Sequence, residues 1–87
     1  MGLAVETSNR FEKRYKKLPK KLRETAKQKE VLFRENPYHP SLETHKLHGR
    51  DAGAWGFSIN QKYRIKFVFL TKDSVLFLDV GTHDIYQ

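Results

Sequence analysis

A chain of 87 residues forms one domain, residues 1–87, and leaves little core from which to build a cofactor-sized cavity. Because it contains no cysteine, it can form neither disulfide bonds nor thiolate metal sites. No apolar run approaches the roughly 20 residues of a membrane span. The opening MGLAVETSNR lacks a signal-peptide pattern, so we expect a cytoplasmic protein that does not enter a membrane.

Positive charge is concentrated in the N-terminal half of the chain. The formal net charge is +7, and residues 1–35 hold 11 Lys and Arg against 5 Asp and Glu, a surplus of +6. Such a surface suits a polyanion such as RNA, or an acidic protein partner. A basic surface that serves only solubility is the alternative interpretation.

Two helices are predicted in this half, after an alternation at residues 3–5 that is compatible with one added strand. Asn9 is the expected N-cap of the first helix, with Glu12 three residues later. Apolar side chains follow at helical spacing, at Phe11, Tyr15 and Leu18. Pro19 is suited to open the second helix, and Asn36-Pro37 ends it. The pattern therefore predicts a helical hairpin.

Residues 36–53 are a predicted loop, because prolines and glycines interrupt it and no period persists, with one short extended piece at residues 44–47. Three of the four histidines lie in this loop, at His39, His45 and His48. A zinc site is one interpretation of such a group. The chain offers no cysteine and no metal-type spacing to a second pair, so we expect neither a metal nor a cofactor.

Three apolar runs at residues 55–59, 63–70 and 75–80 predict an antiparallel meander. Because strand side chains alternate between faces, Ile65 and Phe67 point to one face while Arg64 and Lys66 point to the other. A sheet covered by helices on one side gives this pattern. The cationic face is then available to a ligand, although two solvated strand residues would give the same pattern.

The chain has no Gly-rich phosphate loop, nucleophile elbow or recognisable carboxylate pair. Its histidines, Arg64 and aromatic residues suit RNA cleavage without a metal, because the ribose 2′-OH is itself the nucleophile. A histidine serves as base or acid near neutral pH, and arginine offers a planar fork to phosphate oxygens. Aromatic rings hold unstacked bases.

Five ordered segments carry a resemblance to a known family: FEKRYKKLPKKLRE, NPYHPSLETHKLHG, WGFSI, YRIKFVF and GTHDIY. From about Asn9 onward they resemble the RelE/ParE superfamily of bacterial toxin–antitoxin toxins. The THKLHG loop and the histidine near the end are most similar to the YafQ-type and YoeB-type branches, which cleave mRNA, usually in the ribosomal A site. The resemblance implies an α+β fold, with two N-terminal helices packed on a twisted antiparallel β-sheet, the microbial-ribonuclease-like architecture.

The resemblance also implies roles for individual residues. Arg64, in YRI, matches the phosphate-contacting arginine, and His83, in GTHDIY, matches the terminal histidine expected to be the general acid. Tyr86 matches the aromatic residue that follows it. His45, in THKL, matches a histidine of the YafQ branch and is the candidate base. Glu43 is the one carboxylate that matches the YoeB-type base. The group that accepts the 2′ proton is therefore left open. The RNA-binding residues expected beside this set are Trp55, Lys66, Lys16, Lys17, Lys20 and Lys21, with core packing the alternative for Trp55.

The implied function is that of a type II toxin: a metal-independent endoribonuclease that cleaves mRNA on the ribosome. Its partners would be a cognate antitoxin, mRNA and ribosomal RNA. ParE-type members of the superfamily instead inhibit DNA gyrase without enzymatic activity, and an inactive member that only binds its partner is a further alternative. The fold does not separate these functions.

Overall fold

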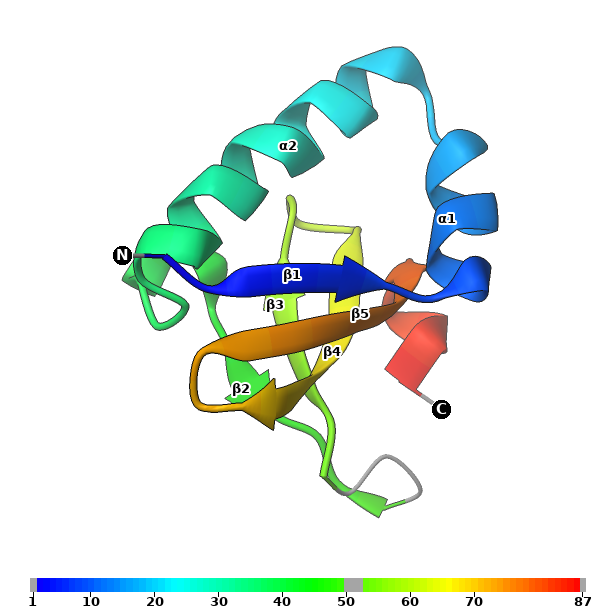
Figure 1. Ribbon diagram of the computed structural model, residues 1–87. Coiled ribbons are helices and arrows are strands. Elements are labelled where there is room, and N and C mark those ends of the chain that lie inside the picture. Colours follow the sequence, from blue (N-terminus) through cyan, green and yellow to red (C-terminus); the bar gives the residue numbers. More distant parts are fainter. Residues whose placement is uncertain (1, 50–52, 87) are drawn as a thin grey trace.

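The computed structural model describes residues 2–49 and 53–86. Within these residues the chain runs through strands, two α-helices and two 3₁₀ helices (Figure 1). In chain order they are β1 (Ala4–Thr7), α1 (Asn9–Lys16), α2 (Lys20–Glu35), η1 (Pro40–Leu42), β2 (His45–Lys46), β3 (Trp55–Ser58), β4 (Arg64–Thr71), β5 (Ser74–Gly81) and η3 (His83–Tyr86). No helix of the described chain is long and apolar enough to span a bilayer.

The strands form one mixed sheet in the order β1-β5-β4-β3-β2. Strands β3, β4 and β5 pair antiparallel in sequence order, as the meander predicts, and β2, within the extended piece expected at residues 44–47, pairs antiparallel to β3. The strand compatible with residues 3–5 forms as β1, and it pairs parallel to β5, with Ala4 opposite Ser74. A parallel pair needs a long crossover, and here the helical hairpin and the rest of the sheet supply it. The two-helix α+β prediction is confirmed, with a parallel edge strand in addition.

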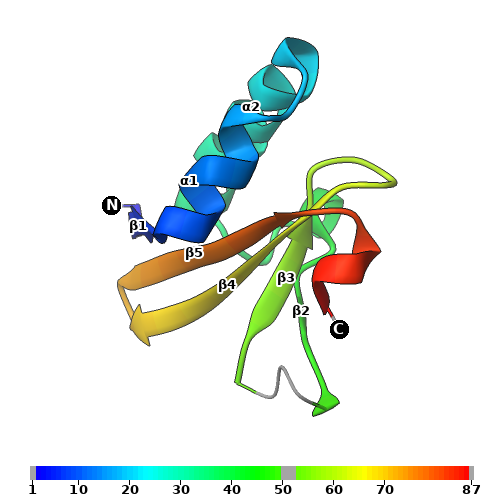
Figure 2. The ribbon, with the colours of Figure 1, turned by 90° about the vertical axis from the view of Figure 1, so that its right-hand side faces the viewer.

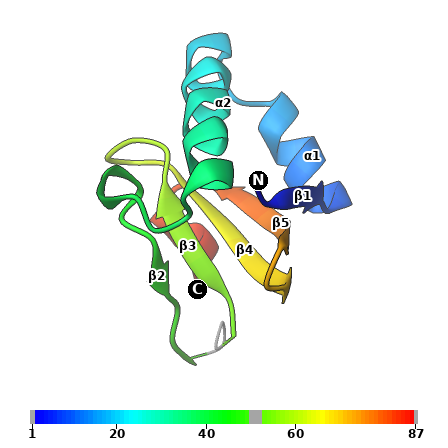
Figure 3. The same ribbon diagram turned by 60° about the vertical axis from the view of Figure 1, so that its left-hand side comes forward.

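Helices α1 and α2 lie on one face of the sheet, while η3 lies on the opposite face (Figures 2 and 3). The core between helices and sheet contains a cluster of phenylalanine rings among aliphatic side chains. Phe33 of α2 packs its ring 4.6 Å from that of Phe57 and 4.9 Å from that of Phe67, measured between centroids. All three side chains are fully buried. Burial of these rings is the main force that holds α2 against the sheet.

The alternation predicted for β4 is confirmed by burial. Ile65 and Phe67 face the helices and are about 1% and 0% exposed, whereas Arg64 and Lys66 are half-buried on the other face. We call that second face, the one not covered by helices, the open face of the sheet.

The start of α1 differs from the prediction, because Ser8 and not Asn9 is the N-cap. The Ser8 hydroxyl accepts a hydrogen bond from the Phe11 amide at 3.0 Å and donates one to the Leu78 carbonyl at 2.9 Å. One side chain thus caps the helix and ties it to β5, a tertiary advantage that the sequence pattern of Asn9 does not reveal. Likewise Pro19 is the N-cap of α2 and precedes its first turn.

Candidate functional site

The candidate site is built where η3 folds back across the open face. Gly56 of β3 is buried directly under the ring of Tyr86, and a Cβ at Gly56 would lie 2.1 Å from the Tyr86 hydroxyl oxygen. Gly81 similarly makes room for Ile85, whose methyl carbon would lie 2.8 Å from a Cβ there. Glycine inside a strand often marks such a close approach. Two glycines therefore set the position of η3 and its aromatic side chain.

Tyr86 stands between two exposed histidines. Its ring centroid is 5.7 Å from that of His45 and 5.0 Å from that of His83. The Tyr86 hydroxyl is buried and has no hydrogen-bond partner among the described residues. Burial raises the pKa of Tyr86 to about 12, against a smaller lowering by the positive charge of Arg64. The tyrosine is thus a neutral wall of the site at physiological pH.

His45 is held in a defined tautomer by the backbone. Its Nδ1 lies 2.9 Å from the Glu43 carbonyl oxygen, which can only accept, so Nδ1 carries the proton in this contact. In the neutral ring Nε2 then has the lone pair and is the atom able to take a proton. Glu43 itself has a left-handed backbone, with φ of 51°, and its carboxylate accepts a hydrogen bond of 3.0 Å from Ser58.

Arg64 is the first residue of the central strand β4, opposite Ser58 of β3 and Gly81 of β5. Its Nη1 donates to the carbonyl oxygens of Asn60 at 2.6 Å and Tyr63 at 3.2 Å, so the turn between β3 and β4 orients the guanidinium. A hollow of about 360 Å³ opens beside it, lined by Gln61, Lys62, Arg64, Thr82 and His83. We call this the Arg64 hollow.

The structure therefore brings His45, Arg64, His83 and Tyr86 to the same face of the sheet. Lys66 is also on that face, opposite Gly56 and Asp79, and lines a second cleft. Arg64 and His83 line a hollow open to solvent, and His45 lies in ring contact with Tyr86. An imidazole beside a guanidinium is an arrangement suited to acid–base chemistry on an anion.

Trp55 is not part of this group. Its partner in the register is Phe67, so it lies on the helix-covered face, where its ring packs 6.0 Å from Tyr38 and 5.5 Å from Phe69. Lys46 lies over the Trp55 ring, with Nζ 5.4 Å from the centroid. Any base that stacks on Trp55 would do so on the other side of the sheet from Arg64.

Four exposed lysines lie at the junction of the two helices, and none of them lines the Arg64 hollow. Figure 2 shows this junction at the end of the helix pair that is turned away from the sheet. They are Lys16, Lys17, Lys20 and Lys21.

Several residues of the site carry no motif in the sequence. Gly56 acts through its position under Tyr86, and Ser58 through its hydrogen bond to Glu43. Of the two, only the glycine within a strand run is visible in the sequence as a sign of a close approach. Asp79 is 4% exposed, and a carboxylate inside the apolar run VLFLDV is a signal that a buried partner is needed. No group of three or more His, Asp or Glu able to hold a metal occurs in residues 2–49 and 53–86.

No protein-family model matches the sequence, and no curated protein matches it. Solved structures do match. YafQ from E. coli strain BL21(DE3) has a TM-score of 0.78 at 21% identity, over 95% of this chain and 96% of that one. YafQ in the E. coli DinJ–YafQ toxin–antitoxin complex has a TM-score of 0.76 at 20% identity, over 98% of this chain and 97% of that one. A YoeB/ParE toxin from Agrobacterium tumefaciens has a TM-score of 0.77 at 13% identity, over 93% of this chain and 99% of that one. The chain has the fold of these toxins, as its sequence resemblance implies.

Proposed function

We propose that the protein is the toxin of a type II toxin–antitoxin system and that it cleaves mRNA in the ribosomal A site. The observation that carries the proposal is the grouping of His45, His83 and Arg64 around Tyr86 on the open face. The similarity in fold to YafQ and to a YoeB/ParE toxin supports the toxin assignment. The partner inferred from the DinJ–YafQ complex is a cognate antitoxin.

The proposed reaction is an attack of the ribose 2′ oxygen on the adjacent phosphorus. His45 takes the 2′ proton on Nε2, the atom that its contact with the Glu43 carbonyl leaves as acceptor. The bond from phosphorus to the 5′ oxygen breaks, and His83 donates its proton to that oxygen. The products are a 2′,3′-cyclic phosphate, or the 3′ phosphate after hydrolysis, and a 5′-OH end. Each proton transfer contributes on the order of 10²–10⁴ in rate.

Arg64 is assigned to the phosphate. Its guanidinium is oriented by two carbonyl oxygens of the neighbouring turn before any ligand arrives, so little reorganisation is needed as negative charge builds on the phosphate. Tyr86 is assigned to the RNA bases, as a neutral ring beside the scissile linkage. The proposed mechanism uses no metal ion: the substrate supplies the nucleophile, the histidines transfer the protons, and Arg64 supplies the positive charge.

The test is primer extension on a translated message, with a parallel measurement of ribosome binding for each variant. His83→Ala should abolish cleavage while ribosome and antitoxin binding persist, because a proton donor acts only in the transition state. Arg64→Ala should lose cleavage and some affinity. The matched control is His48→Ala, which removes an exposed histidine outside the group.

Full cleavage by His83→Ala would remove the acid assignment. Because ribosomes themselves need Mg²⁺, the protein alone is dialysed against EDTA and then assayed at constant Mg²⁺. Loss of cleavage by the dialysed protein, restored by a transition-metal ion, would contradict the metal-independent mechanism. If wild-type protein cut no message and inhibited DNA gyrase, the nuclease proposal would be replaced by the ParE-type function.

A further inference from the structure

A second cleft lies on the other side of Thr82 from the Arg64 hollow. It has a volume of about 660 Å³, and its charged side chains are Arg10, Arg14, Lys66, Asp79 and Asp84. Thr82 lines both spaces, so the cleft and the hollow are neighbours along one surface. We call this second space the arginine cleft.

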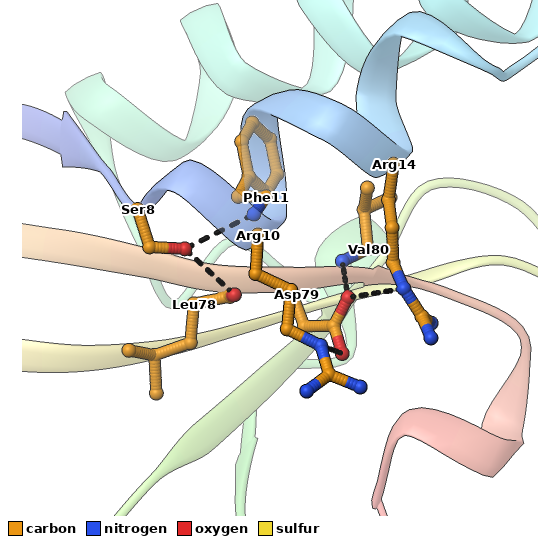
Figure 4. A network of polar contacts seen from close by, with 7 residues as sticks. All are labelled: Ser8, Arg10, Phe11, Arg14, Leu78, Asp79 and Val80. Atoms are coloured by element: carbon orange, nitrogen blue, oxygen red, sulfur yellow. Dashed lines mark hydrogen bonds and ion pairs between the residues drawn. The ribbon is translucent and has the colours of Figure 1, made fainter.

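The arginine cleft is organised by a buried carboxylate. Asp79 is 4% exposed. Its Oδ1 accepts a hydrogen bond from the Val80 amide at 2.9 Å and lies 3.4 Å from Arg14 Nε (Figure 4). Its Oδ2 lies 3.2 Å from Arg10 Nε. A buried charge is kept only where such partners compensate it. The two arginines of α1 thus approach Asp79 through the Nε side of each guanidinium.

The terminal nitrogens of both guanidinium groups point away from Asp79, as Figure 4 shows. The Arg10 and Arg14 side chains are 67% and 46% exposed, so both are accessible from solvent at the cleft. Arg14 Nη1 would lie 3.5 Å from a Cβ on Gly81, the residue paired with Arg64 across the sheet. A guanidinium that is anchored at one edge and open at the other is suited to a phosphate oxygen pair.

We propose that the arginine cleft binds a second backbone phosphate of the same RNA strand, flanking the phosphate held at Arg64. This inference rests on the proposed function. RNA is favoured over an acidic protein by continuity, because a strand carries a charge at every nucleotide and the cleft adjoins the Arg64 hollow at Thr82. Asp79 holds the arginines in place before the RNA arrives, which lowers the entropic cost of binding.

The test uses ribosomes programmed with a set of messages. Each message carries a single uncharged methylphosphonate linkage, placed at a different position flanking the cleavage site. Single-turnover cleavage is measured against protein concentration to obtain an apparent Kd. The variant Arg10→Gln/Arg14→Gln/Asp79→Asn removes the unit with a net loss of one positive charge, and the amide oxygen that replaces the carboxylate still accepts from Val80. The matched control is Lys72→Gln, an exposed lysine in the turn after β4.

For wild type and Lys72→Gln, one flanking methylphosphonate should raise the apparent Kd about tenfold, the effect of one charge-assisted hydrogen bond. The triple variant should bind the unmodified message about tenfold more weakly, and that methylphosphonate should then add no further loss. If thermal melting shows that the triple variant is unfolded, Arg10→Gln alone is used instead, because it leaves Arg14 on Asp79. This single variant should reduce the methylphosphonate effect.

Equal responses of wild type and triple variant at every flanking linkage would overturn the inference while the proposed nuclease function stands. Loss of antitoxin affinity in the triple variant, with a wild-type response to the modified RNA, would also overturn it and assign the cleft to an acidic protein. A wild-type protein that leaves the unmodified message intact would overturn the proposed function and this inference with it.

Discussion

Gly56→Ala should displace Tyr86 and disable the site without unfolding the protein. A Cβ at this position would lie 2.1 Å from the tyrosine oxygen and 2.6 Å from Cζ, whereas ordinary contacts begin at 3.4 Å. Going from 2.1 Å to 3.4 Å, the hydroxyl must retreat by about 1.3 Å. A misplacement of about 1 Å in an active site costs on the order of 10² in rate. We therefore expect cleavage to fall by about that factor.

The stability cost of the same change should be modest, because overpacking costs about 1–3 kcal/mol against a domain total of about 5–15 kcal/mol. Urea unfolding followed by fluorescence measures it. In the double variant Gly56→Ala/Tyr86→Ala the clashing ring is gone, so adding Gly56→Ala to Tyr86→Ala should cost no further stability. Cleavage by Gly56→Ala at the wild-type rate would refute this account of the site. So would an equal loss of stability from Gly56→Ala in the wild-type and Tyr86→Ala backgrounds.

Three further predictions concern the core, the charge and the tyrosine. Phe67→Ala should cost roughly 3–5 kcal/mol in a urea melt because Phe67 is fully buried. The control is Leu70→Ala, which truncates a side chain that is 47% exposed, and an unchanged melt for Phe67→Ala would mean that the faces of β4 are assigned wrongly. The four helix-junction lysines, when changed to glutamine, should give weaker ribosome binding; they are Lys16, Lys17, Lys20 and Lys21. The slope of log affinity against log salt concentration should fall by about one unit per lost phosphate contact, and an unchanged slope would exclude these lysines from the interface. Because the folded pKa of Tyr86 is raised from 10.0 to about 12, its neutral form favours folding, and this stability should be present below pH 10 and lost as the pH rises toward 12. Tyr86→Phe should abolish that component of the pH dependence without loss of stability at neutral pH, since the buried hydroxyl has no partner in the described chain.

The sequence predicted features that depend on local pattern. Alternation in YRIKFVF predicts which side of β4 is buried, and Asn36-Pro37 predicts where α2 ends, because each follows from the geometry of a single element. The four proposed catalytic residues were identified through the ordered family segments; the structure places them on one face of the sheet, and their catalytic roles stay predictions.

Features that depend on register between elements were not predictable. Whether Trp55 stacks on a ligand or packs beside the core is decided by its pairing with Phe67, which the sequence does not reveal. The same holds for Gly56 beneath Tyr86 and for the contact of Arg10 and Arg14 with Asp79, residues more than sixty positions apart. Ser8 replaces Asn9 as the cap because it has a second partner on β5.

The parallel pairing of β1 with β5 also bears on the order in which the molecule assembles. Ala4 and Ser74 are 70 positions apart, so this contact requires closure of most of the chain, whereas β3, β4 and β5 pair with their sequence neighbours. We expect the meander to form early and β1 to dock late. Because α1 follows β1 directly, Arg10 and Arg14 would reach Asp79 only in that late step, so the Arg64 hollow would be framed before the arginine cleft beside it exists.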